Sequence, residues 1–537
     1  MFQSESEPES ESGPESEHRS PLLPVAIALV TVGTLLLVAA ALQPSLHVIG
    51  VADGGAVTPA AFEDLQIQAG PATQAQLDGV PVPLRRNSDG DGGDKASLEV
   101  PVPAEGRHTL VVTSPGEAIP GWGASKELTF DVDATPPAVA LDVPEPVELG
   151  QPSVITGRAL GAETVSALGE TVDVAEDGSF SVPVQPGTAS VDLSAVDAAG
   201  NTAARQVPVH VKHPGMRAVH MSALAWSSDS LREPILQMAK EGRINTVQLD
   251  IKDESGEIGY ASQVPLALEI GASKGYYDAR AALDQLHDAG LRVVGRVVAF
   301  RDPILAEASW TGGHKDRVLQ QSDGSPWSGK YGKYAFTNFA NPEVRGYNIA
   351  LAEEASELGF DEILYDYVRR PDGKVSSMRI TGLNTTPEQS IADFVGDTRS
   401  AIRKHGALLG ASVYGIAATR PTEIAQDISK IADRADYVAP MVYPSHWGNG
   451  EYGVANPEAE PYDITARSLA DFRSITGGRH NAVIPWLQAF SLRHTYGPAE
   501  VRAQIEAAES NGMDSFLLWN ASCRYDADGL SVAPAAP

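Results

Sequence analysis

The sequence has almost no cysteine, little basic charge and only one long hydrophobic run. Cys523 is the only cysteine in 537 residues, so no disulfide can form within the chain and no cysteine-based zinc site is expected. Lys and Arg number 40 against 70 Asp and Glu, which gives a formal net charge of -30. Because a nucleic-acid-binding protein needs a basic face, this charge argues against a nucleic-acid partner.

Several motifs that bind cofactors or activate nucleophiles are also absent. The chain has no Gly-rich phosphate loop and no Gly-x-Ser-x-Gly sequence, and no second metal ligand stands at a suitable spacing from His446. We therefore predict no cofactor and no metal for this protein.

The single long hydrophobic run lies close to the N-terminus. Residues 1–21 are acidic and rich in Ser and Glu, which predicts a disordered tail. Residues 22–42 carry no charge and are long enough to span a bilayer as a helix. Because Arg19 is the nearby basic residue, we expect a cytoplasmic tail, a single-pass transmembrane signal-anchor, and all later residues outside the cytoplasm. The alternative is a cleaved signal peptide, which would be unusually long and would begin with an acidic segment.

Short β-type runs, separated by Pro and Gly, fill the next part of the chain. The linker that begins at Asp133 divides them into units of residues 43–134 and 135–213, each typical of a small β-sandwich. The Asp-x-Thr-Pro-Pro linker and the Asp-x-Ala-Gly-Asn turn at residues 197–201 resemble those of bacterial immunoglobulin-like repeats. The resemblance implies two Ig-like domains, which usually act as spacers or glycan-contact modules.

From Met216 onwards, apolar strand patterns alternate with helical patterns, which indicates a parallel sheet. The expected strands are 217–222, 244–251, 291–300, 362–367, 408–414, 436–443, 482–490 and 514–519. The expected helices are 229–241, 278–289, 343–358, 388–405, 422–434, 462–475 and 498–511. This count predicts a TIM (β/α)8 barrel over residues 214–525, followed by a flexible tail at 526–537. A doubly wound sheet is the alternative, but it would usually carry a Gly-rich loop after its first strand.

Acidic residues stand at the ends of two expected barrel strands. Alternation places Gln248 and Asp250 on the inward face of one strand and Asp366 on the inward face of another. Arg296 lies on the strand between them, where burial is costly unless the arginine is paired. Strands two positions apart are separated by roughly 10 Å, so leaning side chains bring the carboxyls to about 5–9 Å, the range that glycosidases use.

We therefore predict Asp366 and Asp250 as catalytic carboxylates, with Asp366 as nucleophile or base. Because the arginine would lower both pKa values, the proton donor is expected elsewhere. Asp253 and Glu254, just after the second strand, are the possible donors. The alternative interpretation is a buried ion-pair cluster that only stabilises the barrel.

Aromatic and amide side chains follow the other strands. Aromatic rings stack on the C–H faces of sugars, and amides bind their hydroxyl groups. We predict a substrate-binding wall of Arg296, Tyr443, His446, Trp486, Gln488 and Trp519. The insertion at residues 301–342 follows the third strand and is expected to cover the same rim as a lid or substrate wall.

Residues of about 216–520 resemble a bacterial family of putative glycoside hydrolase domains. The matching segments are Gln248–Asp253, Phe360–Arg369 and Pro440–His446. This resemblance implies a TIM-barrel enzyme that hydrolyses a glycosidic bond outside the cell.

A wider similarity to family-18 chitinases involves Asp361, Asp366 and the segment Met441–Tyr443. The sequence has Val368 where that family has its catalytic Glu. We therefore expect a direct two-carboxylate mechanism rather than substrate assistance.

The sequence supports two hypotheses of function. The first is a membrane-anchored glycosidase that cleaves a cell-envelope or extracellular polysaccharide. The second is a non-catalytic glycan-binding or cell-surface structural protein on a degenerate glycosidase barrel, which Val368 favours. The expected partners are a polysaccharide and, through the anchor, a membrane; no obligate protein partner is evident.

Overall fold

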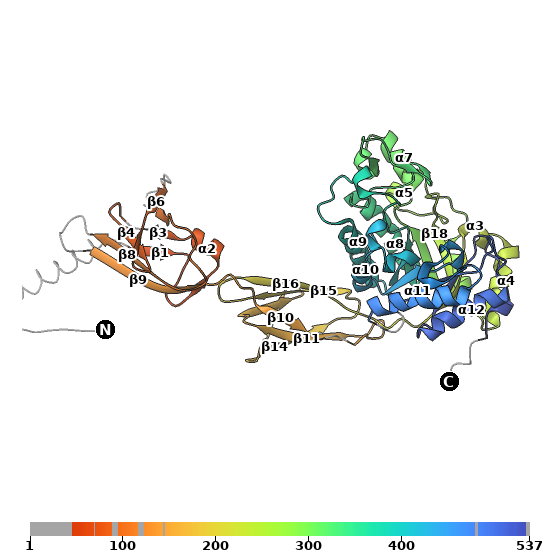
Figure 1. Ribbon diagram of the computed structural model, residues 1–537, viewed down its shortest axis with the longest axis horizontal. Helices are drawn as coiled ribbons and strands as arrows, with labels where there is room; N and C mark the ends of the chain where they lie inside the picture. Colours follow the sequence, from red (N-terminus) through yellow and green to blue (C-terminus); the bar gives the residue numbers. More distant parts are fainter. Residues whose placement is uncertain are drawn as a thin grey trace, which may run out of the picture.

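The computed structural model describes residues 46–68, 70–87, 95–115, 123–142, 145–477, 479 and 482–532. Two β-rich units and a barrel follow one another along an elongated molecule (Figure 1). The predicted tail and signal-anchor, residues 1–42, lie outside the described residues. Within the described ranges, no helix combines the length and the hydrophobicity that crossing a bilayer requires.

The first β-rich unit consists of two sheets around a core of its own. One sheet has the strand order β1-β3-β7-β6, and the other has the order β2-β9-β8-β4-β5. Side chains alternate along the long hairpin β8–β9, so that Leu110, Val112, Leu128 and Phe130 face the core. The elements are β1 (His47–Ile49), β2 (Ala56–Val57), α2 (Pro59–Glu63), β3 (Gln66–Gln68), β4 (Gln74–Leu77), β5 (Val80–Val82), β6 (Leu84–Asn87), β7 (Lys95–Leu98), β8 (Gly106–Pro115) and β9 (Gly123–Val132).

The second β-rich unit also has two sheets, with the orders β10-β11-β14 and β13-β12-β15-β16. Ile155, Val182, Val191 and Leu193 belong to its separate core. The strands are β10 (Ala138–Leu141), β11 (Ser153–Leu160), β12 (Thr164–Ala167), β13 (Glu170–Val172), β14 (Ser179–Val184), β15 (Ser190–Val196) and β16 (Thr202–Pro208). Both units are β-rich, and their Ig-like relationship stays a prediction.

Eight parallel strands then close into a barrel in the order of the chain. They are β17 (Arg217–Met221), β18 (Thr246–Lys252), β19 (Arg292–Val298), β23 (Glu362–Asp366), β25 (Leu408–Tyr414), β26 (Tyr437–Met441), β27 (Trp486–Gln488) and β28 (Phe516–Trp519). This closed ring fits the TIM barrel that the sequence predicts. Inside the ring, Ala218, Val294, Leu364 and Leu517 pack as an inner core, separate from the larger core between strands and helices.

Helices surround the barrel, and short elements decorate its rim. The α-helices are α3 (Ala223–Trp226), α4 (Asp229–Lys240), α5 (Pro265–Glu269), α6 (Ala279–Asp288), α7 (Pro303–Thr311), α8 (Pro342–Leu358), α9 (Pro387–Arg403), α10 (Ile428–Arg434), α11 (Pro461–Ile475) and α12 (Pro498–Ser510). The short strands are β20 (Gln320–Gln321), β21 (Ser328–Gly329), β22 (Gly332–Lys333) and β24 (Met378–Arg379). The 3-10 helices are η1 (Lys315–Arg317), η2 (Val375–Ser377), η3 (Gly415–Ala418), η4 (Pro421–Glu423), η5 (Pro444–His446), η6 (Glu451–Gly453) and η7 (Ala527–Gly529). The sequence did not predict the helices α3, α5 and α7. The first two are short, and α7 has an apolar sequence without a clear helical period.

Local signals around α8 explain how the chain delivers Asp366 to the rim. The Asn341 side chain accepts a hydrogen bond from the Glu343 amide at 3.0 Å, and Pro342 fits the first helical position. The helix ends at Gly359, whose φ of 114° is accessible mainly to glycine. The chain therefore reverses at once and enters β23, which ends at Asp366.

The second β-rich unit contacts the barrel beside α9 and α10, at the end where the strands begin (Figure 1). We call this the closed end of the barrel. Arg399 of α9 donates hydrogen bonds to Ala189 O of the β unit at 3.1 Å and to Ala435 O of the barrel at 3.2 Å. His213 Nε2 lies 3.2 Å from Glu362 Oε2, at the first residue of β23. The mouth of the barrel, where the strands end, therefore lies away from the β units.

The end of the chain differs from the predicted flexible tail. Leu530 is only 2% exposed, and Arg243 Nη1 donates to Ala527 O and Leu530 O, each at 2.7 Å. The stretch up to residue 532 therefore packs on the barrel, because an apolar side chain and two backbone carbonyls find partners there. Residues 533–537 lie outside the described residues.

Candidate active site

Arg296 on β19 is the centre of a polar cluster at the barrel mouth. It is 1% exposed; its Nε and Nη2 donate to Asp366 Oδ2 at 3.0 and 2.7 Å, and its Nη1 donates to Asp250 Oδ1 at 3.1 Å. Nη2 also donates to the carboxylate of Glu254. Burial alone would lower the pKa of Arg296, but Glu254, Asp250 and Asp366 together raise it well above its usual value. The structure therefore brings both predicted catalytic carboxylates to the predicted arginine.

The cluster faces a cavity of about 450 Å³, which we call the site cavity. This volume lies within the range of about 300–1,000 Å³ that is typical of small-molecule sites. Arg296, Asp366 and Glu254 form part of its polar side. Its aromatic side consists of Tyr367, Tyr414, Tyr443, His446, Trp447, Trp486 and Trp519. The predicted substrate-binding residues therefore line this cavity, with the exception of Gln488.

Gln488 lies beneath the cavity wall instead of in it. Its side chain is fully buried; its Oε1 accepts a hydrogen bond from the Ser445 amide at 3.0 Å, and its Nε2 donates to Phe490 O at 2.8 Å. Alternation along β27 identified the inward face, but these backbone partners occupy the amide. Gln488 therefore holds the loop that carries His446.

Asp250 lies behind Arg296 and is not part of the cavity lining. Its Oδ1 also accepts from Gln248 Nε2 at 3.2 Å, and its Oδ2 lies 3.1 Å from His220 Nε2. Burial raises the pKa of Asp250, but His220 and Arg296 outweigh it and hold this pKa at about 2. Burial lowers the pKa of His220, whereas Asp250 raises it to about 9. Asp250 is therefore an anion between two cations, well suited to orient Arg296.

Asp366 ends β23 and is held from both sides. Its Oδ2 binds Arg296, and its Oδ1 accepts the amide N–H of Tyr367 at 2.7 Å. Tyr367 has a φ of 47°, in the left-handed region that bulky residues rarely adopt. Its ring lies 5.0 Å from the guanidinium groups of both Arg301 and Arg369, and its hydroxyl accepts from Arg301 Nη1 at 2.9 Å. This strained turn, fixed by the ring contacts, directs the amide at the carboxylate.

One of the two predicted proton donors reaches the site cavity. Glu254 lines it with a side chain 31% exposed. Burial raises the pKa of Glu254, but Arg296 outweighs this effect, so the net shift is downward. Asp253 lines a separate small cleft, where its Oδ1 accepts the amides of Ser255 at 2.9 Å and Glu257 at 3.0 Å. Asp253 therefore shapes the turn after β18, although burial raises its pKa.

Trp519 and Trp486 form a rigid part of the aromatic wall. The Trp519 ring stacks on His220 with centroids 4.0 Å apart, and the Arg296 guanidinium lies 5.0 Å from its centroid. Trp486 packs edge-on against Trp519 and donates from Nε1 to Ser412 Oγ at 3.0 Å. Both indoles are thus oriented before any ligand binds.

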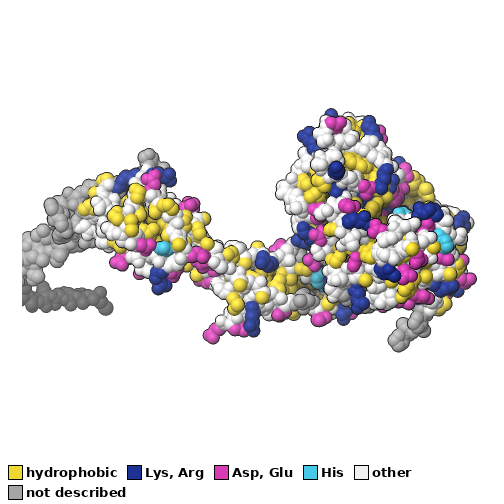
Figure 2. All heavy atoms as spheres, in the orientation of Figure 1, with side chains coloured by type: hydrophobic (Ala, Val, Ile, Leu, Met, Phe, Trp, Pro, Cys, Tyr) yellow, Lys and Arg dark blue, Asp and Glu magenta, His cyan; other side chains and the backbone are white. Residues whose placement is uncertain are grey.

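The insertion at 301–342 lies over the rim, and the tip of its β21–β22 hairpin reaches the cavity. Lys330 at this tip lines the cavity, and its Nζ lies 2.6 Å from Asp372 Oδ2. The hydroxyl of Tyr331 lies 3.1 Å from both Asp372 Oδ2 and the hydroxyl of Tyr414. Figure 2 shows Lys and Arg side chains around this lobe, which carries α7.

Two residues of the wider resemblance lie outside the cavity. Asp361 stands just before β23, at the closed end, where it contacts His287 at 3.0 Å and accepts the Val293 amide at 2.8 Å. Val368 is fully buried in the outer core, because the turn at Tyr367 ends the alternation of β23. Neither position contributes to the cluster around Arg296.

Sequence reasoning missed His220, Tyr367, Asp372 and Tyr414. Tyr414 could have been found, since it ends β25 as an aromatic residue at the same rim as Tyr443. His220 stands in an apolar strand, which signals only that it needs a buried partner. The role of Tyr367 depends on its backbone angle, and that of Asp372 depends on a contact between distant loops. No local sequence pattern indicates either feature.

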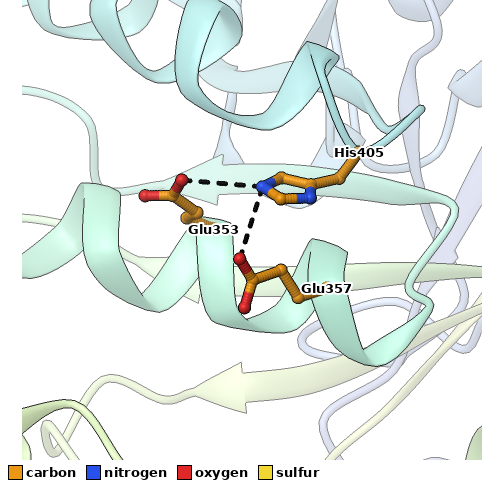
Figure 3. A group of neighbouring side chains, drawn as sticks. All are labelled: Glu353, Glu357 and His405. Carbon is orange, nitrogen blue, oxygen red and sulfur yellow. Dashed lines mark ion pairs between the residues drawn. The ribbon is translucent and has the colours of Figure 1, made fainter.

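A separate group of side chains lies on α8 and the loop before β25. His405 Nε2 lies 3.5 Å from one carboxylate oxygen of Glu353 and one of Glu357 (Figure 3). The ammonium group of Lys404 also binds Glu353. Because this lysine occupies a carboxylate that a metal would need, the group is best described as a surface ion-pair network.

The chain matches one protein family and is similar to several solved structures. Residues 218–525 match the family described as "Putative glycosyl hydrolase domain". A hypothetical protein from Ruminiclostridium thermocellum ATCC 27405 is 30% identical, over 36% of this chain and 96% of that chain, with a TM-score of 0.33. The PgaB (BpsB) glycoside hydrolase domain from Bordetella bronchiseptica is 15% identical, over 58% of this chain and 95% of that chain, with a TM-score of 0.45. An α-galactosidase from Thermus thermophilus is 13% identical, over 73% of this chain and 90% of that chain, with a TM-score of 0.38. No curated protein matches the chain.

The family match covers more than half of the chain and contains the whole barrel from β18 to β28. Arg296, Asp366 and Glu254, with the aromatic wall, lie inside the matched residues. The chain therefore belongs to the putative glycosyl hydrolase domain family.

Proposed function

We propose that this protein is a glycosidase that cleaves a cell-envelope or extracellular polysaccharide with two carboxylates. The observation that carries the proposal is the convergence of Asp366 and Glu254 on one atom, Arg296 Nη2, in a cavity with an aromatic wall. Membership of the glycosyl hydrolase family supports the same class of reaction. Asp250, which does not line the site cavity, positions Arg296.

The spacing of the two carboxylates favours a retaining mechanism. Two oxygens that hydrogen-bond to one nitrogen lie no more than about 6 Å apart, which is twice a hydrogen-bond length. Retaining glycosidases have carboxyl groups about 5–5.5 Å apart, whereas inverting enzymes need about 6.5–9.5 Å to admit a water molecule. We therefore assign Asp366 as the nucleophile and Glu254 as the acid and base.

In this mechanism, Asp366 attacks the anomeric carbon while the bond to the leaving oxygen breaks. Glu254 gives its proton to that oxygen, which leaves as a hydroxyl group. Water then attacks the same carbon and transfers a proton to Glu254, and the bond to Asp366 breaks. The amide of Tyr367 and Arg296 stabilise the carboxylate of Asp366 as it departs.

The acid role requires Glu254 to be protonated when the glycan is bound. Its pKa is lowered because Arg296 outweighs burial. A sugar hydroxyl that displaces Glu254 from Arg296 removes this hydrogen bond and weakens the effect of the arginine, whereas burial and the negative charge of Asp250 still raise the pKa of Glu254. Asp366 keeps a second contact, to Arg296 Nε, so the arginine stays paired with the nucleophile when Glu254 is displaced.

Arg296 is also the observation that favours the second candidate, a glycan-binding protein without turnover. It holds Asp250, Glu254 and Asp366 together, and it lowers the pKa values of Asp250 and Glu254, which stabilises their ionised forms. A barrel in this state binds sugars on its aromatic wall but lacks a protonated donor.

The test uses the full chain and a panel of purified cell-envelope polysaccharides, with product sizes measured by chromatography and mass spectrometry. We expect the wild type to release shorter glycans. Asp366→Asn should lower the rate at least about a hundredfold while glycan binding persists. Glu254→Gln should lose activity on polysaccharides but retain it on dinitrophenyl glycosides, whose leaving group needs no proton. Asp253→Asn, the matched control outside the cavity, should stay close to wild type. Binding without products from any polysaccharide would instead establish the second candidate.

The proposed location follows from residues 22–42, which we propose as a membrane anchor that holds the later residues outside the cytoplasm. In this arrangement the two β-rich units separate the membrane from the barrel. Fractionation of cells that express the full chain tests this: protease added to intact cells should digest the barrel, and a protected barrel would contradict the location.

A further inference from the structure

A second hollow adjoins the site cavity. It has a volume of about 410 Å³ and lies between the β21–β22 hairpin and the loop that leads to β24; we call it the distal hollow. Lys330 and Asp372 belong to the lining of both the site cavity and the distal hollow. The two spaces therefore meet at the Lys330–Asp372 ion pair, and we call them together the groove.

This ion pair is able to open without loss of the hairpin. The Lys330 side chain is 68% exposed and that of Asp372 is 38% exposed. Exposed ion pairs of this kind contribute little to stability, because water and salt screen them. Tyr331 anchors the hairpin independently, since its hydroxyl accepts from Arg369 Nη2 at 3.0 Å and lies 3.1 Å from that of Tyr414. A ligand in the groove can therefore replace the Lys330–Asp372 contact at little cost.

The lining of the distal hollow suits a sugar ring. Besides the ion pair and Tyr331, it consists of Gln321, Trp327, Ser328, Gly329, Gly373 and Ser377. Hydroxyl and amide groups donate to and accept from sugar hydroxyls, and Trp327, which is only 8% exposed and packs edge-on against Phe336, supports this lining from below. Asp366 and Glu254 line the site cavity and not the distal hollow. A ring bound in the distal hollow is therefore not the ring that is cleaved.

We propose that the distal hollow is a second sugar-binding subsite, which holds another ring of the glycan chain that is cut at Asp366. This inference rests on the proposed function. It assigns the enzyme a polymeric substrate, because a chain must cross the Lys330–Asp372 pair to fill both spaces. Binding energy from the remote ring then serves to place the scissile bond against the carboxylates.

The experiment blocks the distal hollow and follows activity against chain length. Ser377→Trp fills the hollow from η2, and Ser328→Trp fills it from the hairpin. Ser376→Trp, at the neighbouring position in η2 outside the lining, is the matched control. The probe is a ladder of oligosaccharides prepared from the polysaccharide that the wild-type full chain cleaves. Thermal midpoints of all variants establish that they fold.

For the wild type and Ser376→Trp, kcat/KM should rise as the oligosaccharide becomes long enough to reach the distal hollow. For Ser377→Trp and Ser328→Trp, kcat/KM should fall about tenfold on the long oligosaccharides and stay unchanged on the shortest ones cleaved. An unaltered length dependence, or an equal loss at every length, overturns the subsite while the glycosidase stands. If the wild type cleaves no polysaccharide, the proposed function fails first, and the subsite fails with it.

Discussion

Two ion pairs of the same construction stand at opposite ends of the same two barrel strands. On β19, Arg292 and Arg296 are four residues apart, as are Glu362 and Asp366 on β23. Arg292 Nη2 donates to Glu362 Oε1 at 2.9 Å at the closed end, and Arg296 Nη2 donates to Asp366 Oδ2 at 2.7 Å at the mouth. The strands and the spacing are thus matched, and each pair joins an arginine to a carboxylate, so the two pairs differ in their surroundings and in the length of the acidic side chain.

At the closed end, the carboxylate of Glu362 is sealed, whereas the Arg292 side chain is 30% exposed. Glu362 is fully buried and also contacts His213 from the linker to the second β unit. Burial raises the pKa of Glu362, but His213 and Arg292 hold it at about 2. At the mouth, Asp366 and Arg296 line a cavity with an aromatic wall. The two pairs therefore differ in whether the carboxylate faces a cavity. This difference separates a structural ion pair from a candidate catalytic one.

Neutralising each carboxylate in turn tests whether the two ion pairs have different roles. Asp366→Asn should lower polysaccharide hydrolysis at least about a hundredfold. Glu362→Gln should leave the rate per folded molecule near wild type but lower the free energy of unfolding by about 3 kcal/mol, because Arg292 loses its buried partner. Kinetics and thermal unfolding measured on both variants check the two effects. A catalytic loss in Glu362→Gln as large as that in Asp366→Asn would show that the two ends are not separate in role.

A second test concerns the turn that makes the mouth different from the base. We expect Tyr367→Gly to keep kcat near wild type, because glycine adopts a φ of 47° without strain and retains the amide bond to Asp366. Tyr367→Val should lower kcat about tenfold or more, because a β-branched residue disfavours this angle and the amide moves from the carboxylate. Both variants lose the ring from the cavity wall, so KM should rise in each. Equal kcat values in the two variants would show that the backbone conformation of Tyr367 does not position Asp366.

The smallest expected effect concerns the buried His220–Asp250 pair behind Arg296. The pKa of His220 is raised from 6.5 to about 9, so its contribution to stability is full below about pH 6.5 and is lost as pH rises through 9. The pKa of Asp250 is lowered from 3.8 to about 2, so its contribution is present above 3.8 and is lost as pH falls through 2. His220→Asn should therefore be less stable than the wild type near neutral pH, and this difference should shrink above pH 9.

Thermal midpoints between pH 5 and pH 10 measure this effect. His287→Asn is the matched control, because His287 also contacts an aspartate, Asp361, but its side chain is 40% exposed. Its curve shows the effect of losing a histidine–aspartate contact at the surface. A His220→Asn curve that is parallel to that of the wild type would mean that His220 does not carry the alkaline dependence.

Much of the barrel could be predicted because its strands and helices have distinct periods. The expected helix 343–358 and the expected strand 362–367 correspond to α8 and β23 of the structure. Alternation also identified the inward faces of β18 and β23, and hence Asp250 and Asp366. A period gives the face of a strand but not the depth of a side chain, so it could not show that Asp250 lies behind Arg296.

The rest of the candidate site depends on contacts that no period encodes. Gln488 lies on the inward face of β27, but the backbone groups of Ser445 and Phe490 bind the two ends of its amide. Glu254 and Asp253 are adjacent in sequence, and only the turn after β18 decides which of them reaches the cavity. The positive φ of Tyr367 follows from packing between Arg301 and Arg369, residues far apart in the chain.

The way in which the chain enters the barrel has a consequence for large substrates. His213, in the linker from the β units, is fixed at the closed end against Glu362, and Arg399 clamps the second β unit to the same end. The upstream domains therefore stand clear of the opening, and a long glycan can pass across Asp366 without steric hindrance from them. A chain held at its N-terminal side would present its opening outward, toward material at a distance from the point of attachment.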